Sequence, residues 1–200
     1  MRRQLSILLG VVTLSFHAHT EPLDQYMILN HLDNYGNLYL RNKPYTSLPE
    51  PLTVKGNLNI EKTAIKKLPK ELDIQGSLQA ANSDLARVPS GTKIKGYANL
   101  LGTQIKSWSK GVKVGGFINF TDTPLTKLPN RFRVKGDLSL IRTPITQLPE
   151  GIVVDGDLYL GGSGITKFPD TMTVKGNIYL GGNVITKWPE NLTLGGAVAR

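Results

Sequence analysis

The sequence predicts a β-rich repeat solenoid of about nine coils, because one 20-residue pattern repeats along most of the chain. One glycine recurs at that interval without interruption, at Gly36, Gly56, Gly76, Gly96, Gly116, Gly136, Gly156, Gly176 and Gly196. A proline recurs at the same interval, with Ser109 as the exception, at Pro49, Pro69, Pro89, Pro129, Pro149, Pro169 and Pro189. Aliphatic anchors recur as well, and in residues 148–167 they are Leu148, Ile152, Val154, Leu158, Leu160 and Ile165.

Two short parallel strands are expected in each coil. The pairs Ile152/Val154 and Leu158/Leu160 show the alternation of half-buried strands. Coils stacked about 4.8 Å apart would bury their anchors as one continuous column. The recurring glycine is expected either to form a corner with positive φ or to let neighbouring backbones approach closely. A ladder of small polar residues is expected to bind turn backbone at an inward corner: Thr63, Ser83, Thr103, Thr123, Thr143, Ser163 and Asn183.

Residues 1–20 are predicted to be a secretory signal peptide. Arg2 and Arg3 precede an apolar run from Leu5 to Phe16, which is too short to span a bilayer comfortably. This pattern predicts a secreted or periplasmic protein.

Residues 21–31 are predicted to form an N-terminal capping helix that covers the first coil. Thr20 is a candidate N-cap, and Pro22 would lie in the first turn. Residues 32–200 are then assigned to the solenoid, in which open ends need such a cover.

Some coils depart from the pattern. The fifth departs most, at Ala98, Leu101, Trp108 and Ser109, which indicates a bend, a local ligand feature or, as the favoured interpretation, tolerated drift. The sequence stops at Arg200, halfway through a coil, so the last half-coil is a cap, a pairing edge or the end of a fragment. An uncapped stack exposes strand edges, so self-association through the C-terminal edge is the alternative function.

Residues 158–165, LYLGGSGI, fit the leucine-rich-repeat consensus LxLxxNxL, with Ser163 in place of asparagine. Leu-Pro recurs in four coils, as at Leu148–Pro149. Over about residues 32–200 the chain therefore resembles the bacterial leucine-rich repeats found in type III-secreted effectors. In this family a leucine usually stands three residues before LxL. Here the pattern Val-x-Gly-x-Leu replaces it, as at Val174–Ile178, so we expect a second short strand on the convex side and no helix.

Composition restricts the chemistry. The absence of cysteine excludes a thiolate nucleophile and the cysteine-dependent ligase domain that some of these effectors carry. The histidines are His17, His19 and His31, with no acidic cluster nearby, so no metal site is expected. We therefore predict a protein that is not an enzyme and needs no cofactor.

The predicted ligand-binding residues lie between the two leucines of each LxL pair, where side chains point outward from the concave sheet. They are Tyr39, Asn59, Gln79, Asn99, Asn119, Tyr159 and Tyr179, and Ser139 occupies the remaining place in this uncharged column. A neighbouring column reads Asn37, Asn57, Ser77, Tyr97, Phe117, Asp137, Asp157 and Asn177. Amide and aromatic side chains suit a protein or a glycan, and the resemblance implies binding on this face. The alternative is that Asn and Tyr ladders only stabilise a parallel sheet.

The formal net charge of +9 favours acidic partners, or lysines that merely solvate the surface. One basic stripe follows the opposite strand: Lys55, Lys93, Lys95, Lys113, Arg131, Arg133, Lys135 and Lys175. A second basic group lies near the proline corner: Lys66, Lys67, Arg87, Lys106, Lys127, Lys167 and Lys187. Lysine dominates and few aromatics interleave, so nucleic acid is not an expected partner, whereas contact with an anionic surface stays open.

Overall fold

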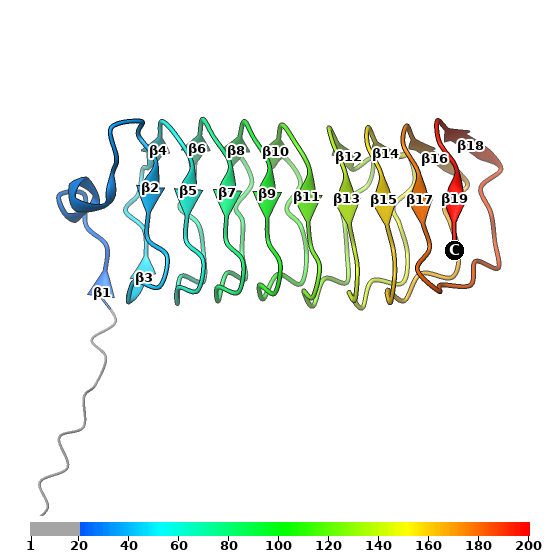
Figure 1. The fold of residues 1–200 in the computed structure, drawn as a ribbon, viewed down its shortest axis with the longest axis horizontal. Coiled ribbons are helices and arrows are strands. Elements are labelled where there is room, and N and C mark those ends of the chain that lie inside the picture. Colours follow the sequence, from blue (N-terminus) through cyan, green and yellow to red (C-terminus); the bar gives the residue numbers. More distant parts are fainter. Residues whose placement is uncertain (1–20) are drawn as a thin grey trace, which may run out of the picture.

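The structure is a computed structural model that describes residues 21–200; the predicted signal peptide of residues 1–20 lies outside the described residues. The described chain is a parallel β-solenoid of about nine coils, as predicted (Figure 1). One strand of each coil joins a nine-stranded sheet, which we call the front sheet. Its strands are β2 (Leu38–Tyr39), β5 (Leu58–Asn59), β7 (Leu78–Gln79), β9 (Ala98–Asn99), β11 (Ile118–Asn119), β13 (Leu138–Ser139), β15 (Leu158–Tyr159), β17 (Ile178–Tyr179) and β19 (Val198–Ala199).

The expected second strand lies on the opposite, back side of the coil. The back strands form two separate four-stranded sheets, not one. The first contains β4 (Thr53–Val54), β6 (Asp73–Ile74), β8 (Lys93–Ile94) and β10 (Lys113–Val114). The second contains β12 (Arg133–Val134), β14 (Ile152–Val154), β16 (Thr171–Val174) and β18 (Asn191–Leu194).

We call the interruption between β10 and β12 the sheet break. Figure 1 shows the two groups of back strands set apart at this point, whereas β11 and β13 of the front sheet stay paired. The break falls beside the coil in which Trp108 and Ser109 depart from the repeat. These departures therefore coincide with a structural feature.

The N-terminal capping helix predicted for residues 21–31 is not seen. The segment begins with the strand β1 (Glu21–Pro22), which pairs with β3 (Tyr45–Ser47), and continues to a five-residue 3-10 helix η1 (Met27–His31). The Asp24 carboxylate accepts bonds from the Tyr26 and Met27 N–H groups at 2.8 and 2.7 Å, which favours a tight turn there. Within residues 21–200, no helix is long and apolar enough to cross a membrane.

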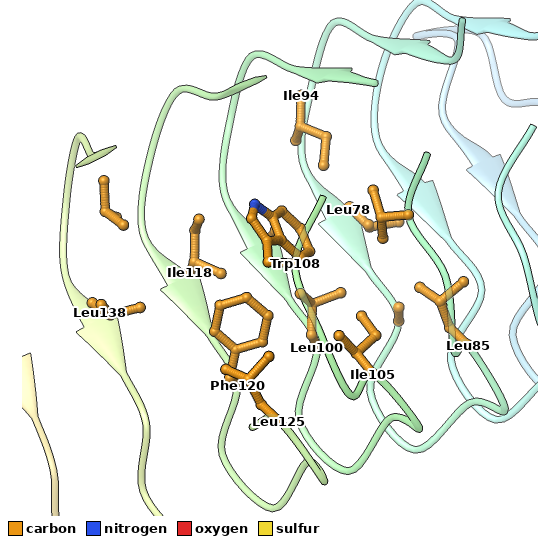
Figure 2. Packing of buried hydrophobic residues seen from close by; sticks show 14 of the residues in the cluster. Leu78, Leu85, Ile94, Leu100, Ile105, Trp108, Ile118, Phe120, Leu125 and Leu138 are labelled. Atoms are coloured by element: carbon orange, nitrogen blue, oxygen red, sulfur yellow. The ribbon is translucent and has the colours of Figure 1, made fainter. Parts of the chain in front are cut away.

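The core is a set of aliphatic columns that run along the solenoid. In one turn of the chain every anchor is fully buried: Leu58, Ile60, Ile65, Leu68, Leu72 and Ile74 are each 0% exposed. Figure 2 shows the stacking, with Leu85, Ile105 and Leu125 following one another from coil to coil. The pattern of anchors read from the sequence therefore matches the buried positions.

Two of the predicted backbone features are present. At the inward corner the Thr63 hydroxyl donates to the Ile60 carbonyl at 2.7 Å, and the equivalent Thr123 hydroxyl donates to Phe120 at 2.7 Å. Close backbone approach, and not positive φ, explains the recurring glycine in the regular coils. A Cβ on Gly76 would lie 2.7 Å from the backbone of Gly56, so only glycine fits between these coils.

Candidate functional site

The predicted binding column lies on one face of the front sheet. The parallel register pairs Tyr39 with Asn59, Asn59 with Gln79, and so on through Tyr179, one residue per coil. Exposure varies along it: Tyr39 is 48% exposed and Asn59 only 8%. The structure thus brings together all the predicted residues, but it does not make them equally accessible.

The amides of the column bond to one another, to Tyr97 and to nearby backbone N–H groups. Asn59 Nδ2 donates to Gln79 Oε1 at 3.0 Å, and Gln79 Nε2 donates to the Tyr97 hydroxyl oxygen at 3.0 Å. Asn119 Nδ2 donates to Asn99 Oδ1 at 3.1 Å. These amides therefore form the ladder that was the alternative interpretation, and part of their bonding capacity is used within the sheet.

The neighbouring column has a structural role at its polar positions. Asn37 Oδ1 accepts a bond from the Asn57 N–H of the next coil at 2.7 Å. The same contact recurs from Asp157 Oδ1 to the Asn177 N–H at 2.6 Å. Each such side chain satisfies a backbone donor of the following coil, which holds the coils in register at the glycine corner.

Two aromatic stacks interrupt these ladders. Tyr97 and Phe117 are parallel, with ring centroids 4.5 Å apart, and Tyr159 and Tyr179 are parallel at 4.8 Å. Tyr97 and Phe117 were noted in the neighbouring column but were not among the predicted ligand-binding residues. The signal was present in the sequence, since both are aromatic residues one coil apart at the same position.

A hollow lies between the two stacks, at the coil that carries Ser139. Its volume is about 320 Å³, and its lining includes Phe117, Asn119, Asp137, Ser139, Ile141 and Tyr159. Ser139 is smaller than Asn119 and Tyr159, its two neighbours in the column. Its hydroxyl is hydrogen-bonded to the Thr121 hydroxyl at 2.8 Å. The short side chain leaves space that an amide or a tyrosine would occupy.

The hollow has aromatic walls and a polar rim. The Tyr159 hydroxyl donates to Asp157 Oδ2 at 3.2 Å. Burial raises the pKa of Tyr159, and the carboxylates of Asp157 and Asp137 add to that effect, so the phenol stays neutral. Asp137 is exposed at the edge, so the site combines two aromatic faces with hydrogen-bond acceptors.

The candidates for metal binding were the histidine and carboxylate side chains. Among residues 21–200, no cluster of three or more His, Asp or Glu side chains could hold a metal ion. The His31 ring is bonded to the Tyr45 hydroxyl at 2.8 Å and packs edge-on against the ring. His31 thus serves the packing of the first coil.

Comparison of the chain with protein-family models, with curated proteins and with solved structures found no match. The repeat architecture is therefore established by the coils themselves, and a functional assignment must come from the site.

Proposed function

We propose that this chain is a non-enzymatic binding module that engages a glycan or a protein through the front face, with the hollow at Ser139 at its centre. The observation that carries the proposal is the pair of aromatic stacks on either side of that hollow. Ligand sites combine apolar and aromatic walls with a few placed polar groups, and their volumes begin at roughly 300 Å³.

The size and lining of the hollow suit one sugar ring or one inserted side chain. Phe117 and Tyr159 offer flat apolar surface, while Asp137 offers a carboxylate at the rim. Tyrosine and amide groups supply contact area and hydrogen bonds at low entropic cost. The amides of Asn59 to Asn119 are partly bonded to one another, so we expect them to position the site more than to contact the ligand.

Filling the hollow tests this proposal. Ser139→Tyr would continue the tyrosine column of Tyr159 and Tyr179, so the coil is expected to fold while the space is lost. Binding would be measured first on an array of neutral and acidic oligosaccharides, and then by calorimetry on the oligosaccharides that bind. We expect Ser139→Tyr to reduce the affinity at least about tenfold.

The matched control is Tyr35→Ser, which removes an exposed aromatic residue outside the column and away from the hollow. It should leave the affinity unchanged. If Ser139→Tyr binds with the same affinity as the parent protein, the ligand does not bind in the hollow. If no oligosaccharide binds, a glycan ligand is ruled out and a protein ligand is the form of the proposal that survives.

We further propose that the coils belong to the leucine-rich-repeat class and that residues 1–20 direct export to a secreted or periplasmic location. The LxL spacing and the inward Thr/Ser corner support the class. Intact mass spectrometry of the exported protein tests the second statement. Recovery of the full-length mass from the cytoplasm alone would contradict it.

Self-association through the C-terminal edge stays a second candidate. In the last coil Val184 is 73% exposed, Trp188 44% and Val198 37%, so apolar surface is accessible there. A mass that rises with protein concentration in light scattering, and does not change with salt, would favour this candidate over the front face.

A further inference from the structure

The sheet break leaves unpaired main-chain groups on the back side. In the next coil, Val153 N–H donates to Phe132 O at 2.9 Å, Asp155 N–H to Val134 O at 2.9 Å and Gly156 N–H to Gly136 O at 3.1 Å. Among the described residues, the equivalent bonds across the break are not formed. This leaves donors at Arg133, Lys135 and Gly136 opposite acceptors at Val112, Val114 and Gly116.

Gly115 turns the chain toward the preceding coil. Its N–H is shared between Ile94 O at 2.9 Å and Gly96 O at 3.1 Å. A Cβ here would lie 2.9 Å from the Lys95 carbonyl carbon, so the Lys or Asp found at this position in several other coils does not fit. Val112 and Val114 become partly exposed, whereas Val134 and Val154 are buried at the position of Val114.

Trp108 lies beneath the break with an unsatisfied donor. The side chain is 5% exposed, and its Nε1 is buried without a hydrogen-bond partner. Figure 2 shows this nitrogen on the edge of the indole turned away from Leu100 and Ile105. Trp108 also lines a hollow of about 610 Å³, together with Val112, Phe132 and Arg133. A buried unpaired N–H costs about 1–3 kcal/mol, so this donor marks imperfect packing next to the break.

The adjoining space is strongly basic. A groove of about 470 Å³ has Ile94, Val112 and Val114 in its lining, and we call it the basic groove. Its charged lining consists of Lys93, Lys95, Lys113, Arg133, Lys135 and the single acid Asp73. Asp73 is bonded to Gln75, and Arg133 pairs with Asp155 at 2.9 Å. The ion pairs of residues 21–200 do not include the four lysines, which leaves their charge available.

We propose that the basic groove binds an acidic protein segment in an extended conformation. Lysines supply charge complementarity, and the valines accept the alternate, apolar side chains of a strand. The main-chain groups distinguish the ligand class. The break presents carbonyl acceptors as well as N–H donors, and a peptide satisfies both, whereas a sulfate or phosphate group has no N–H to donate.

The probe for this proposal is a short labelled peptide in which glutamate alternates with valine. Its affinity for the full chain would be measured by fluorescence anisotropy at low and moderate salt. The double variant Lys93→Glu with Lys113→Glu should weaken binding about tenfold or more. The neutral double variant Lys93→Gln with Lys113→Gln should also weaken binding, but by a smaller factor. Circular dichroism would verify that the variants are folded.

Two matched controls make the test specific. Lys127→Glu with Lys167→Glu changes the net charge equally at exposed lysines outside the groove and should leave the affinity unchanged. A peptide with N-methylated amides keeps the charge but loses the N–H donors, and should bind about tenfold more weakly.

Absence of peptide binding would overturn the proposal, as would equal losses in the two pairs of charge-reversal variants. Undiminished binding of the N-methylated peptide would show that main-chain pairing is wrong. Tighter binding of a sulfated oligosaccharide, lost in the Lys93 and Lys113 variants, would replace the acidic peptide by an anionic glycan. Each outcome is independent of the Ser139 hollow, which lies on the other side of the coil.

Discussion

The front and back sides of this solenoid are made by the same repeat but differ in continuity. The front strands form one nine-stranded sheet, and the back strands form two sheets of four. On the front side, side chains such as Asn37 and Asp157 bond to the backbone of the next coil, in addition to the strand ladder. On the back side the strands are joined by main-chain bonds, and at the sheet break these bonds are lost.

The difference shows how side-chain volume limits the stacking of coils. The front column also changes in size, from Leu100 to Phe120, and stays paired with Phe120 fully buried. The back column changes from Thr92 and Val112 to Phe132, with Trp108 beside them, and is interrupted there. A side chain much larger than those of the preceding coil holds the backbones apart unless the core can repack. The front strands stay paired at this point through main-chain bonds, from the Ile118 N–H to Asp137 O and from the Phe120 N–H to Ser139 O, each at 2.9 Å.

Glycine substitutions should show the largest contrast between regular and broken stacking. Gly76→Ala places a Cβ 2.7 Å from the Gly56 backbone and should lower the free energy of unfolding by about 2–3 kcal/mol. Gly136→Ala, whose Cβ would face the coil on the other side of the break, meets Phe117 N at 2.9 Å and Gly116 C at 3.2 Å, and should cost less, about 1–2 kcal/mol. Urea denaturation followed by circular dichroism measures both. Equal losses would mean that the coils are spaced alike at both places.

Valine truncation tests the packing of the back side. Val154 in β14 is 0% exposed, and Val154→Ala should cost about 2 kcal/mol through lost burial and the cavity left behind. Val114 in β10 is partly exposed, so Val114→Ala should cost less than about 1 kcal/mol. The same denaturation experiment applies. A larger loss at Val114 than at Val154 would indicate that the break is closed in solution.

Trp108→Phe separates the indole N–H from the aromatic packing. Phe168 occupies the same position in another coil, so a phenyl ring fits the repeat. Removal of the buried, unpaired N–H offsets the lost volume, and we expect a change of about 1 kcal/mol or less. Trp188→Phe, where the side chain is 44% exposed, is the control. A loss above about 2 kcal/mol only at Trp108 would reveal a hydrogen-bond partner for its N–H in solution.

The smallest effect is expected from the ion pairs beside the break. Hydrogen bonds from Lys175 and Arg133 lower the pKa of Asp155. Because the pKa is lower in the folded state, this contribution is present above the ordinary aspartate range of about 4 and is lost as the pH falls through the folded value. Asp155→Asn should therefore destabilise slightly at neutral pH, and the difference from the parent should vanish in acid. The control at neutral pH is Asp84→Asn, at an exposed aspartate outside these pairs, which should leave the free energy of unfolding close to that of the parent protein.

Much of the candidate site could be predicted because the repeat places each residue. The register from Tyr39 to Tyr179 and the hydroxyl corner at Thr63 follow directly from the 20-residue period. The exposure of each residue could not be predicted in this way. Asn59 and Tyr39 share a column, but Asn59 is buried and bonded to Gln79 whereas Tyr39 is exposed.

The prediction of a capping helix was wrong because it rested on the spacing of apolar residues within 21–31 and left out the strand edge of the first coil. Glu21 and Leu23 donate their N–H groups to Pro44 O and Ser47 O at 3.3 and 3.1 Å. Pairing with the first coil therefore satisfies an open strand edge that a helix would leave exposed. The local sequence of residues 21–31 does not show which non-local hydrogen bonds are available, so this competition could not be predicted from it.

The sequence alone determined the solenoid, its inward anchors and its outward columns, because a strict period repeats the same local environment in every coil. Only the tertiary structure decided where that regularity fails. The sheet break depends on how Trp108, Val112 and Phe132 fit together across coils, and the Ser139 hollow depends on the stacks that flank it. Both are set by the relative sizes of side chains in adjacent coils, which a period cannot specify.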